Sequence, residues 1–415
     1  MGCLLIGFIS VSVAQDTLKL SLRETEKMFL TENYQLIAQQ YETDQASAEI
    51  ITAKLFDNPE LSFENLFYNH ETRKFLETSM ATGQYSASIA QLVKLAGKRN
   101  KNIQLARTGL KLAEYAYFDL MRTLRFELRS TYYKAYYAQQ SALVYEQQIR
   151  SLGQLLEASE KQLSLGNIAA KDIIRIQSLV YGLKAEHNTL MNELEDLKSK
   201  LRQMTNISAE QELAFKADGL QPELFQIDNA PYSLLLDSAR ANRPDLQLAK
   251  TEVTYAQQQL SVQKAMAIPD VEISLSYDLK GNYPEKYTGL GISIPIPLFN
   301  RNQGEIKKAR IAVDARNTGL KMQEAALENE LFSSYKTALK KESLFKSLDQ
   351  NFSKNFDELM TAVTRNFKER NISLIEFLDF YDAYKENTIQ LNNLRYELMN
   401  AKEGINYVTG STIFK

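Results

Sequence analysis

The sequence contains very little cysteine, histidine or tryptophan. One of its 415 residues is cysteine, two are histidine and none is tryptophan. With Cys3 alone, the chain can form neither an internal disulfide nor a cysteine-based zinc site. His70 and His187 lie far apart in the sequence and fit no metal-ligand or catalytic-triad pattern, so we interpret both as surface residues. The sequence therefore predicts no metal site and no cofactor.

Enzyme motifs are also missing. The sequence has no phosphate-binding glycine loop, no nucleophile elbow and no dinucleotide-binding turn. Because no nucleophile lies beside a recognisable base, we do not expect an enzyme. Acidic and basic residues nearly cancel, at 51 against 49, so the charge balance indicates no nucleic-acid partner.

Long apolar runs are absent after the N-terminus. No later stretch approaches the roughly 18 uncharged apolar residues of a spanning helix, so a membrane could be crossed only by a barrel of strands. The run Leu4–Val11, followed by Ser12–Ala14, predicts an export signal peptide at residues 1–14. No basic residue precedes this run. The alternative to a cleaved signal peptide is therefore that translation starts upstream of Met1 and that Cys3 is lipidated.

The chain contains two tandem copies of one structural unit. "NPELSF" (58–63) corresponds to "IPDVEI" (268–273), and "GNIAAKDIIRIQ" (166–177) corresponds to "RNISLIEFLDFY" (370–381). The two spacings, 210 and 204 residues, differ by only a few positions. The chain then divides into a first repeat at 15–207, a linker or equatorial segment at 208–230 and a second repeat at 231–415.

Each repeat has the same predicted order of elements. A helical stretch is followed by two alternating segments around a polar loop, a very long helix, a short turn and a final helix. The helical stretches are about 21–56 and 231–267, and the long helices are about 98–165 and 303–369. Leu124, Leu128 and Tyr132 recur 203 residues later as leucine, leucine and tyrosine, which predicts a shared packing stripe.

The alternating segments predict β-strands with one apolar face. The pattern is clearest in "VEISLSY" (271–277), where apolar and polar residues take opposite sides. The four predicted strands, paired as two hairpins, are 61–67 with 85–92 and 271–277 with 287–294. After the last strand, Pro295 and Pro297 stop sheet pairing and the chain turns into the long helix.

Four such strands cannot span a membrane alone, because their open edges would leave backbone groups unpaired in lipid. Three chains would supply 12 strands, an even number within the range of known barrels. Aromatic residues that suit the membrane interfaces stand near the strand ends: Phe67, Tyr68, Tyr85, Tyr277 and Tyr287.

Taken together, these features resemble the TolC-like outer-membrane efflux proteins, especially the branch for heavy-metal and drug export (CzcC and CusC types). The residues that carry the resemblance are "RPDL" (243–246), "IPIPLFNRNQGEI" (294–306) and the "GNI" turn before Asp172, within the doubled layout. It covers nearly the whole mature chain. In the first repeat, Tyr34 stands where the family usually has proline, which weakens one helix-start signal.

The resemblance implies a mainly α fold with a membrane β-barrel. In this tandem-repeat, TolC-like fold, a homotrimer forms a 12-stranded barrel in the outer membrane of a Gram-negative-type bacterium and a long α-helical barrel in the periplasm. The implied partners are outer-membrane lipid, a periplasmic adaptor (membrane fusion) protein and an inner-membrane RND-type pump. The chain would be the exit duct for small molecules or metal ions. The alternatives are a type I protein-secretion channel and a periplasmic coiled-coil scaffold without a pore.

A conduit needs a gate, and the family geometry places it near the turns between the long and final helices. Asp172 and Glu376 occupy equivalent positions and would form acidic rings in a trimer. We predict that Arg175 pairs with Asp379 or Asp382 across neighbouring helices and holds the closed state. The alternative is that these are ordinary solvated charges near helix N-termini.

The same turns, 166–169 and 370–373, would be the periplasmic tips. Gly166, Asn167 and Asn371 are the predicted contacts with the adaptor. A glycine at this place also suits a helix C-cap, and that role is compatible with such a contact.

Overall fold

The computed structural model describes residues 17–217, 227–281, 285–347 and 352–414. The predicted signal peptide, with Cys3, lies outside these ranges. The chain forms two compact units. One is built from the chain up to Ala38, from Asp119–Arg243 and from Leu327 onward, and the other from Gln39–Phe118 and Pro244–Ala326.

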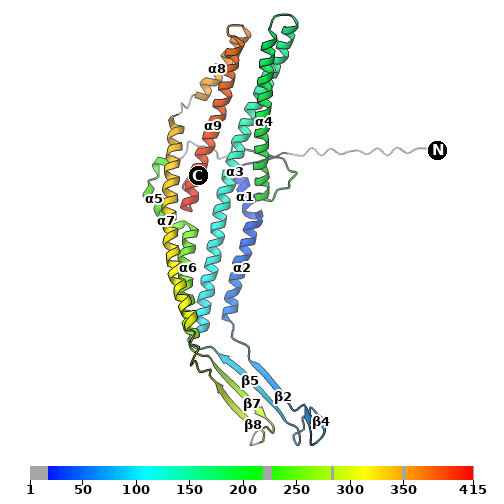
Figure 1. Cartoon of the computed structure of the whole chain (residues 1–415), viewed down its shortest axis with the longest axis vertical. Helices are drawn as coiled ribbons and strands as arrows, with labels where there is room; N and C mark the ends of the chain where they lie inside the picture. Colours follow the sequence, from blue (N-terminus) through cyan, green and yellow to red (C-terminus); the bar gives the residue numbers. More distant parts are fainter. Residues whose placement is uncertain (1–16, 218–226, 282–284, 348–351, 415) are drawn as a thin grey trace, which may run out of the picture. The chain divides into compact units, whose positions relative to one another are not determined.

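The same order of elements occurs twice along the chain (Figure 1). The first series is α1 (Leu22–Glu32), α2 (Tyr34–Lys54), β2 (Glu60–Asn65), β5 (Tyr85–Val93), α3 (Lys98–Ser164) and α4 (Ala170–Thr205). The second series is α5 (Tyr232–Asn242), α6 (Pro244–Met266), β7 (Val271–Asp278), β8 (Tyr287–Ser293), α7 (Gln303–Ser347), α8 (Phe352–Lys368) and α9 (Leu374–Thr409). No helix in the described ranges is both long and apolar enough to cross a bilayer.

The helices depart from the predictions at three places. The first predicted long helix is α3, as expected, whereas the second is described as α7 and α8, on either side of residues 348–351. The predicted helical stretches 21–56 and 231–267 are each divided, at Asn33 and at Arg243. The Asn33 side-chain oxygen accepts hydrogen bonds from the backbone amides of Gln35 (3.0 Å) and Leu36 (3.1 Å). Asn33 thereby caps the start of α2. At the equivalent place in the second series, α6 begins with Pro244.

The predicted packing stripe is the core of the first unit. Leu128, Tyr132 and Leu331 are fully buried. The Tyr132 hydroxyl donates hydrogen bonds to the backbone oxygens of Leu20 and Lys216, both at 2.9 Å. Leu20 is the last residue of β1 (Leu18–Leu20), and Lys216 directly follows β6 (Leu213–Phe215); the sequence did not predict this short parallel strand pair. A short 3-10 helix, η1 (Ile227–Asn229), follows later in the chain.

The four predicted strands form one antiparallel sheet in the order β2-β5-β7-β8 (Figure 1). Both predicted hairpins are confirmed, since β2 pairs with β5 and β7 pairs with β8. In addition, β5 of the first series pairs with β7 of the second. The polar loop after β2 contains a small hairpin, β3 (Tyr68–Asn69) with β4 (Lys74–Phe75). The two series are thus joined in one sheet.

A buried ion pair fixes the start of β7 to the junction between β5 and α3. The Lys98 Nζ atom lies 2.7 Å from Asp270 Oδ1 and 2.6 Å from the Ile268 backbone oxygen. The Leu95 backbone amide donates to the same Asp270 oxygen at 2.8 Å. The Lys98 side chain is only 4% exposed, so its charge depends on these oxygens for compensation.

Candidate functional site

The four-stranded sheet has one apolar face and one polar face. Leu61, Ile89, Leu275 and Leu290 are register partners across all four strands. Because directly paired residues point to the same side of a sheet, they form a continuous apolar row. Their exposed fractions are 77%, 46%, 52% and 74%. No described part of the chain covers this row. Such an exposed apolar patch is unusual and marks an interaction surface.

The next row across the sheet consists of Ser62, Ser88, Ser276 and Gly289. Each of these residues adjoins a member of the apolar row, so it faces the opposite side. All four acids within these strands share that polar side by register: Glu60, Glu64, Glu272 and Asp278. The alternation that the sequence predicted for 271–277 therefore extends across the whole sheet.

The first helix-connecting turn follows α3. Gly166 has a φ of 77°, and its amide donates to the Leu163 backbone oxygen at 2.9 Å. The Asn167 amide donates to the Gln162 backbone oxygen at 3.0 Å, and the Asn167 side-chain amide donates to Gln162 Oε1 at 2.8 Å. Gly166 is therefore a left-handed C-cap, and it remains exposed together with Asn167.

The second turn, after α8, repeats this geometry with a different residue. Arg370 has a φ of 61°, and its amide donates to the Phe367 backbone oxygen at 3.0 Å. The Asn371 amide donates to the Asn366 backbone oxygen at 2.9 Å, and its side chain donates to Glu369 at 3.1 Å. An arginine thus occupies a backbone conformation that suits glycine.

Replacing Arg370 with glycine should stabilise this turn. A left-handed conformation costs a non-glycine residue about 1 kcal/mol, so we expect Arg370→Gly to slow amide exchange at the end of α8 by several-fold. Gly166→Ala is the matched reverse change and should speed exchange at the end of α3. Hydrogen-exchange mass spectrometry measures both, and faster exchange in Arg370→Gly would contradict the expectation.

The two predicted acids after the turns have different surroundings. Ser373 and Glu376 form a complete capping box at the start of α9, in which the Ser373 amide donates to Glu376 Oε2 at 2.8 Å. This backbone hydrogen bond, followed by that of the serine side chain, lowers the pKa of the Glu376 carboxyl. In α4, the cap residue Ala169 offers no side-chain hydrogen bond. Asp172 is half-buried instead and lines a cavity.

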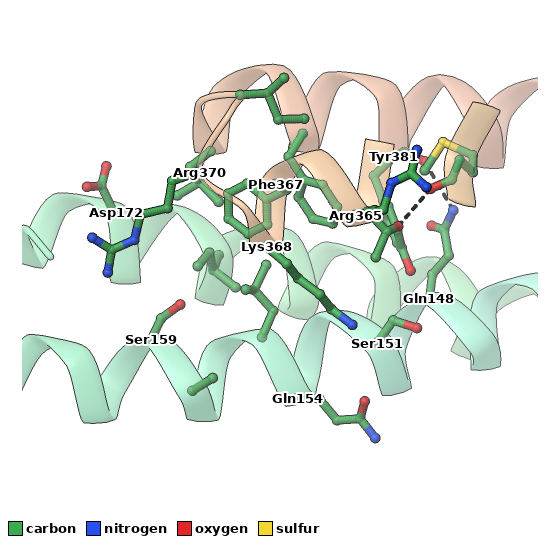
Figure 2. Close-up of a pocket in the computed structure, with 18 of the residues that line it drawn as sticks. Gln148, Ser151, Gln154, Ser159, Asp172, Arg365, Phe367, Lys368, Arg370 and Tyr381 are labelled. Atoms are coloured by element: carbon green, nitrogen blue, oxygen red, sulfur yellow. Dashed lines mark hydrogen bonds between the residues drawn. The ribbon is translucent and has the colours of Figure 1, made fainter. Parts of the chain in front are cut away.

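That cavity separates the α3/α4 pair from the α8/α9 pair near the turns, and its volume is about 1440 Å³ (Figure 2). Its lining is polar along α3, including Gln148 and Ser151, while Arg365 and Lys368 come from α8. An apolar cluster borders it, in which Phe367 stacks on Phe377 with ring centroids 4.4 Å apart. The two helix pairs are therefore only partly packed against each other here.

The structure does not bring Arg175 to its predicted partners within the chain. Arg175 and Asp379 are exposed, and neither has an ion-pair partner among the described residues. Asp382 lies 3.1 Å from Lys385 instead. The pairing of Arg175 with Asp379 or Asp382 across neighbouring helices remains a prediction.

Sequence reasoning missed Lys385, whose side chain is 5% exposed and lies between α9 and α4. The sequence contains a signal for this residue. Lys385 stands seven residues after Leu378 and four after Tyr381, on the face of α9 that packs inward. A lysine at such a position predicts a compensating acid nearby. His187, predicted as a surface residue, is half-buried in the same region, whereas His70 is exposed as expected.

Known proteins resemble this chain in sequence and in architecture. Residues 235–411 match the family model described as outer membrane efflux protein. The chain is 23% identical over 348 residues to the cobalt-zinc-cadmium resistance protein CzcC of Cupriavidus metallidurans. The alignment covers 84% of this chain and 79% of CzcC.

Solved structures have the same fold. The outer membrane channel CmeC of Campylobacter jejuni superimposes with a TM-score of 0.75 at 14% identity, covering 94% of this chain and 85% of CmeC. The CusC structure superimposes with a TM-score of 0.73 at 16% identity, covering 96% of each chain. The chain therefore has the TolC-like fold of these outer-membrane channels. The family match over 235–411, the similarity to CzcC and the fold shared with CusC all support an outer membrane factor of the CzcC/CusC type, as the sequence resemblance predicted. This family comprises channels, not enzymes.

Proposed function

We propose that the protein is the exit duct of a tripartite efflux system and works as a homotrimer in the outer membrane. The observation that carries the proposal is the exposed apolar row across the sheet, formed by Leu61, Ile89, Leu275 and Leu290. In lipid this face needs no cover, and the polar face would line an aqueous lumen.

The edges of the sheet argue for assembly. Within the described ranges, β2 and β8 each pair on one side only. Unpaired backbone groups are too costly in a bilayer, so another copy must supply the missing neighbours. Three copies would give 12 strands, an even number that known barrels use. The helices that continue from the sheet would then form the wall of the periplasmic part.

The proposed cargo is a metal ion or another small molecule. The name of the relative CzcC refers to cobalt, zinc and cadmium resistance, which favours metal ions over polypeptides. An inner-membrane RND-type pump would select the cargo, and a periplasmic adaptor would contact the exposed turns at Gly166, Asn167 and Asn371. Within the part of the chain that the structure describes, the hydrogen bonds of these three residues go to their own helix ends.

The assembly can be tested on protein extracted from outer membranes. We expect extraction by mild detergent and not by salt, and electron-microscope projections that show hollow particles with three-fold symmetry. Extraction by salt, or particles that are single rods, would contradict the duct and favour a scaffold without a pore.

The gate proposal assigns Arg175 to the closed state of the assembled channel, through Asp379 or Asp382 of a neighbouring helix. Loss of this charge should raise the conductance of the closed channel and the leakage of drugs into cells. We expect Arg175→Ala to show this increase in planar bilayers. Lys161→Ala is the control, since Lys161 pairs with Glu157 one turn away on its own exposed helix face. Unchanged conductance in Arg175→Ala would remove Arg175 from the gate.

A further inference from the structure

The loop between β2 and β5 has an inverted arrangement of polar and apolar side chains. This loop, residues 66–84, contains the small β3–β4 hairpin and lies at the end of the sheet away from α2 and α3 (Figure 1). We call it the outer loop. A loop in water gains nothing from exposing apolar surface. Five large apolar side chains of the outer loop are nevertheless exposed: Leu66, Phe67, Phe75, Leu76 and Met80.

Polar side chains occupy the centre of the outer loop. Asn69 is buried, and its Oδ1 atom accepts hydrogen bonds from the backbone amides of Glu71 (2.9 Å) and Thr72 (3.3 Å). Its Nδ2 atom donates to the Thr82 backbone oxygen at 3.0 Å and to Glu77 Oε2 at 3.3 Å. The Glu77 carboxylate also accepts hydrogen bonds from the hydroxyls of Thr72 and Thr82. Because these polar groups bond one another, the apolar side chains have no core of the loop's own to enter.

Ring contacts join the exposed apolar side chains into one patch. The Phe75 ring meets Phe67 edge to face, with ring centroids 5.4 Å apart, and lies 4.8 Å from the ring of Tyr68. The Leu76 amide donates a hydrogen bond to the Phe67 backbone oxygen at 3.0 Å, which holds these two residues beside each other. A contiguous apolar patch of this kind marks an interaction surface.

The apolar face of the sheet leads to the outer loop. Phe63 on β2, Tyr85 on β5 and Tyr277 on β7 share the face of the apolar row, since each stands an even number of residues from its member of that row. The ring centroids of Phe63 and Tyr85 are 6.1 Å apart, as are those of Tyr85 and Tyr277. The Leu66 amide then donates to the Gln84 backbone oxygen at 2.9 Å, so the pairing of β2 with β5 continues into the loop. The patch therefore begins where the apolar face of the sheet ends.

Basic side chains accompany the apolar patch. Arg73 and Lys74 immediately precede Phe75 in the sequence, and all three residues are exposed. Of the two acids in the outer loop, Glu77 is engaged by the threonine hydroxyls, while Glu71 is exposed. Apolar rings next to cations suit the surface of a bilayer, where acyl chains adjoin anionic head groups.

We propose that the outer loop docks on the membrane surface at the outer ends of the strands. Phe67, Phe75 and Leu76 enter the boundary of the acyl chains. Arg73 and Lys74 bind the phosphate groups of the lipid. The inference rests on the proposed function, in which the apolar face of the sheet lies in lipid, and the docked loop would fix how deeply the duct sits in the membrane.

The chain has no tryptophan, so a single introduced tryptophan reports only on its own position. The full-length protein carrying Phe75→Trp is reconstituted into vesicles of phosphatidylcholine and phosphatidylglycerol whose brominated acyl chains quench a nearby indole. We expect quenching as strong as that of Phe63→Trp on the apolar face of β2. Tyr181→Trp on α4 is the control and should not be quenched. The original side chains of Phe75, Phe63 and Tyr181 are equally exposed, at 65%, 63% and 65%.

The three variants separate a failure of the docking from a failure of the duct. Quenching of Phe63→Trp without quenching of Phe75→Trp would overturn the docking, and a blue-shifted emission of Phe75→Trp would then indicate that a second copy of the chain covers the patch. Quenching of Phe75→Trp alone would support the docking and overturn the duct. Absence of quenching in both would overturn both. Phe67→Trp, in the same patch, repeats the measurement if Phe75→Trp does not fold.

The contact with lipid phosphate is measured by adding a second substitution to Phe75→Trp. Lys74→Gln should lower the ratio of docked to free loops about fivefold in vesicles that contain phosphatidylglycerol, which is the contribution of one lysine near an anionic surface. In vesicles of phosphatidylcholine alone its effect should be smaller. Glu71→Gln is the matched control of opposite sign and should not lower the ratio. Quenching that depends neither on phosphatidylglycerol nor on Lys74 would overturn the phosphate contact.

Discussion

Arginine in place of Leu275 should keep the protein out of the outer membrane. Leu275 stands in the middle of the apolar row and is 52% exposed. A cation on the lipid face of a barrel costs about 2–4 kcal/mol at the bilayer midplane, and every copy in the assembly would carry it. We expect Leu275→Arg to be absent from the detergent-extracted outer-membrane fraction when expressed in a Gram-negative host, as measured by immunoblotting.

The neighbouring residue supplies the control. Ser276 lies on the opposite face, where its register partners are Ser88 and Gly289. Ser276→Arg introduces the same charge into the same strand, but on the face that would line the lumen, so this variant should still reach the membrane. Equal amounts of both variants in the membrane fraction would show that the two faces have been assigned wrongly.

Asp270→Asn should lower the stability of the fold at the junction between sheet and helices. The substitution leaves the buried Lys98 ammonium without a negative charge, while its hydrogen bond to the Ile268 oxygen remains. Removing one partner of a buried pair is strongly destabilising, and because Asp270 is partly exposed we expect a loss of about 2 kcal/mol. Thermal unfolding in detergent, followed by circular dichroism, measures the change.

The pH dependence provides a second readout for the same pair. Burial alone would raise the pKa of the Asp270 carboxyl, but hydrogen bonds from Lys98 and from the Leu95 amide lower it below 3.8. The carboxylate therefore contributes stability above pH 3.8, and this is lost as the pH falls through the lowered pKa. Asp270→Asn should lack this acid-side loss. Asp57→Asn is the control, since its pair with Lys94 is exposed and worth little.

The strands were predictable because their signal is local. A period of two fixes which residues share a face, and each hairpin pairs two long strands that follow each other along the chain. The pairing of β5 with β7 was not predictable from the same pattern, because the choice of a partner about 180 residues away leaves no mark in either strand. The β1–β6 pair was missed since three residues are too few to show a period.

Helix boundaries and the site were predicted less completely. The division at Asn33 depends on a side-chain cap that replaces the proline of the other repeat, whereas the sequence alone indicates only a weaker helix start there. The turns at Gly166 and Arg370 were placed correctly because the repeats align there. The inward position of Lys385 follows from the periodicity of α9, but its contact with Glu186, 199 residues away, leaves no local signal in the sequence.

The pairing of β5 with β7 has a consequence for how copies can join. Because β2, β5, β7 and β8 alternate in direction, the two edge strands of one chain point in opposite directions. A following copy that sets its β2 beside β8 therefore continues the alternation without a mismatch. The even number of strands in each chain permits a closed antiparallel ring for any number of identical copies. The copy number must then be decided by curvature and helix packing, and not by strand direction.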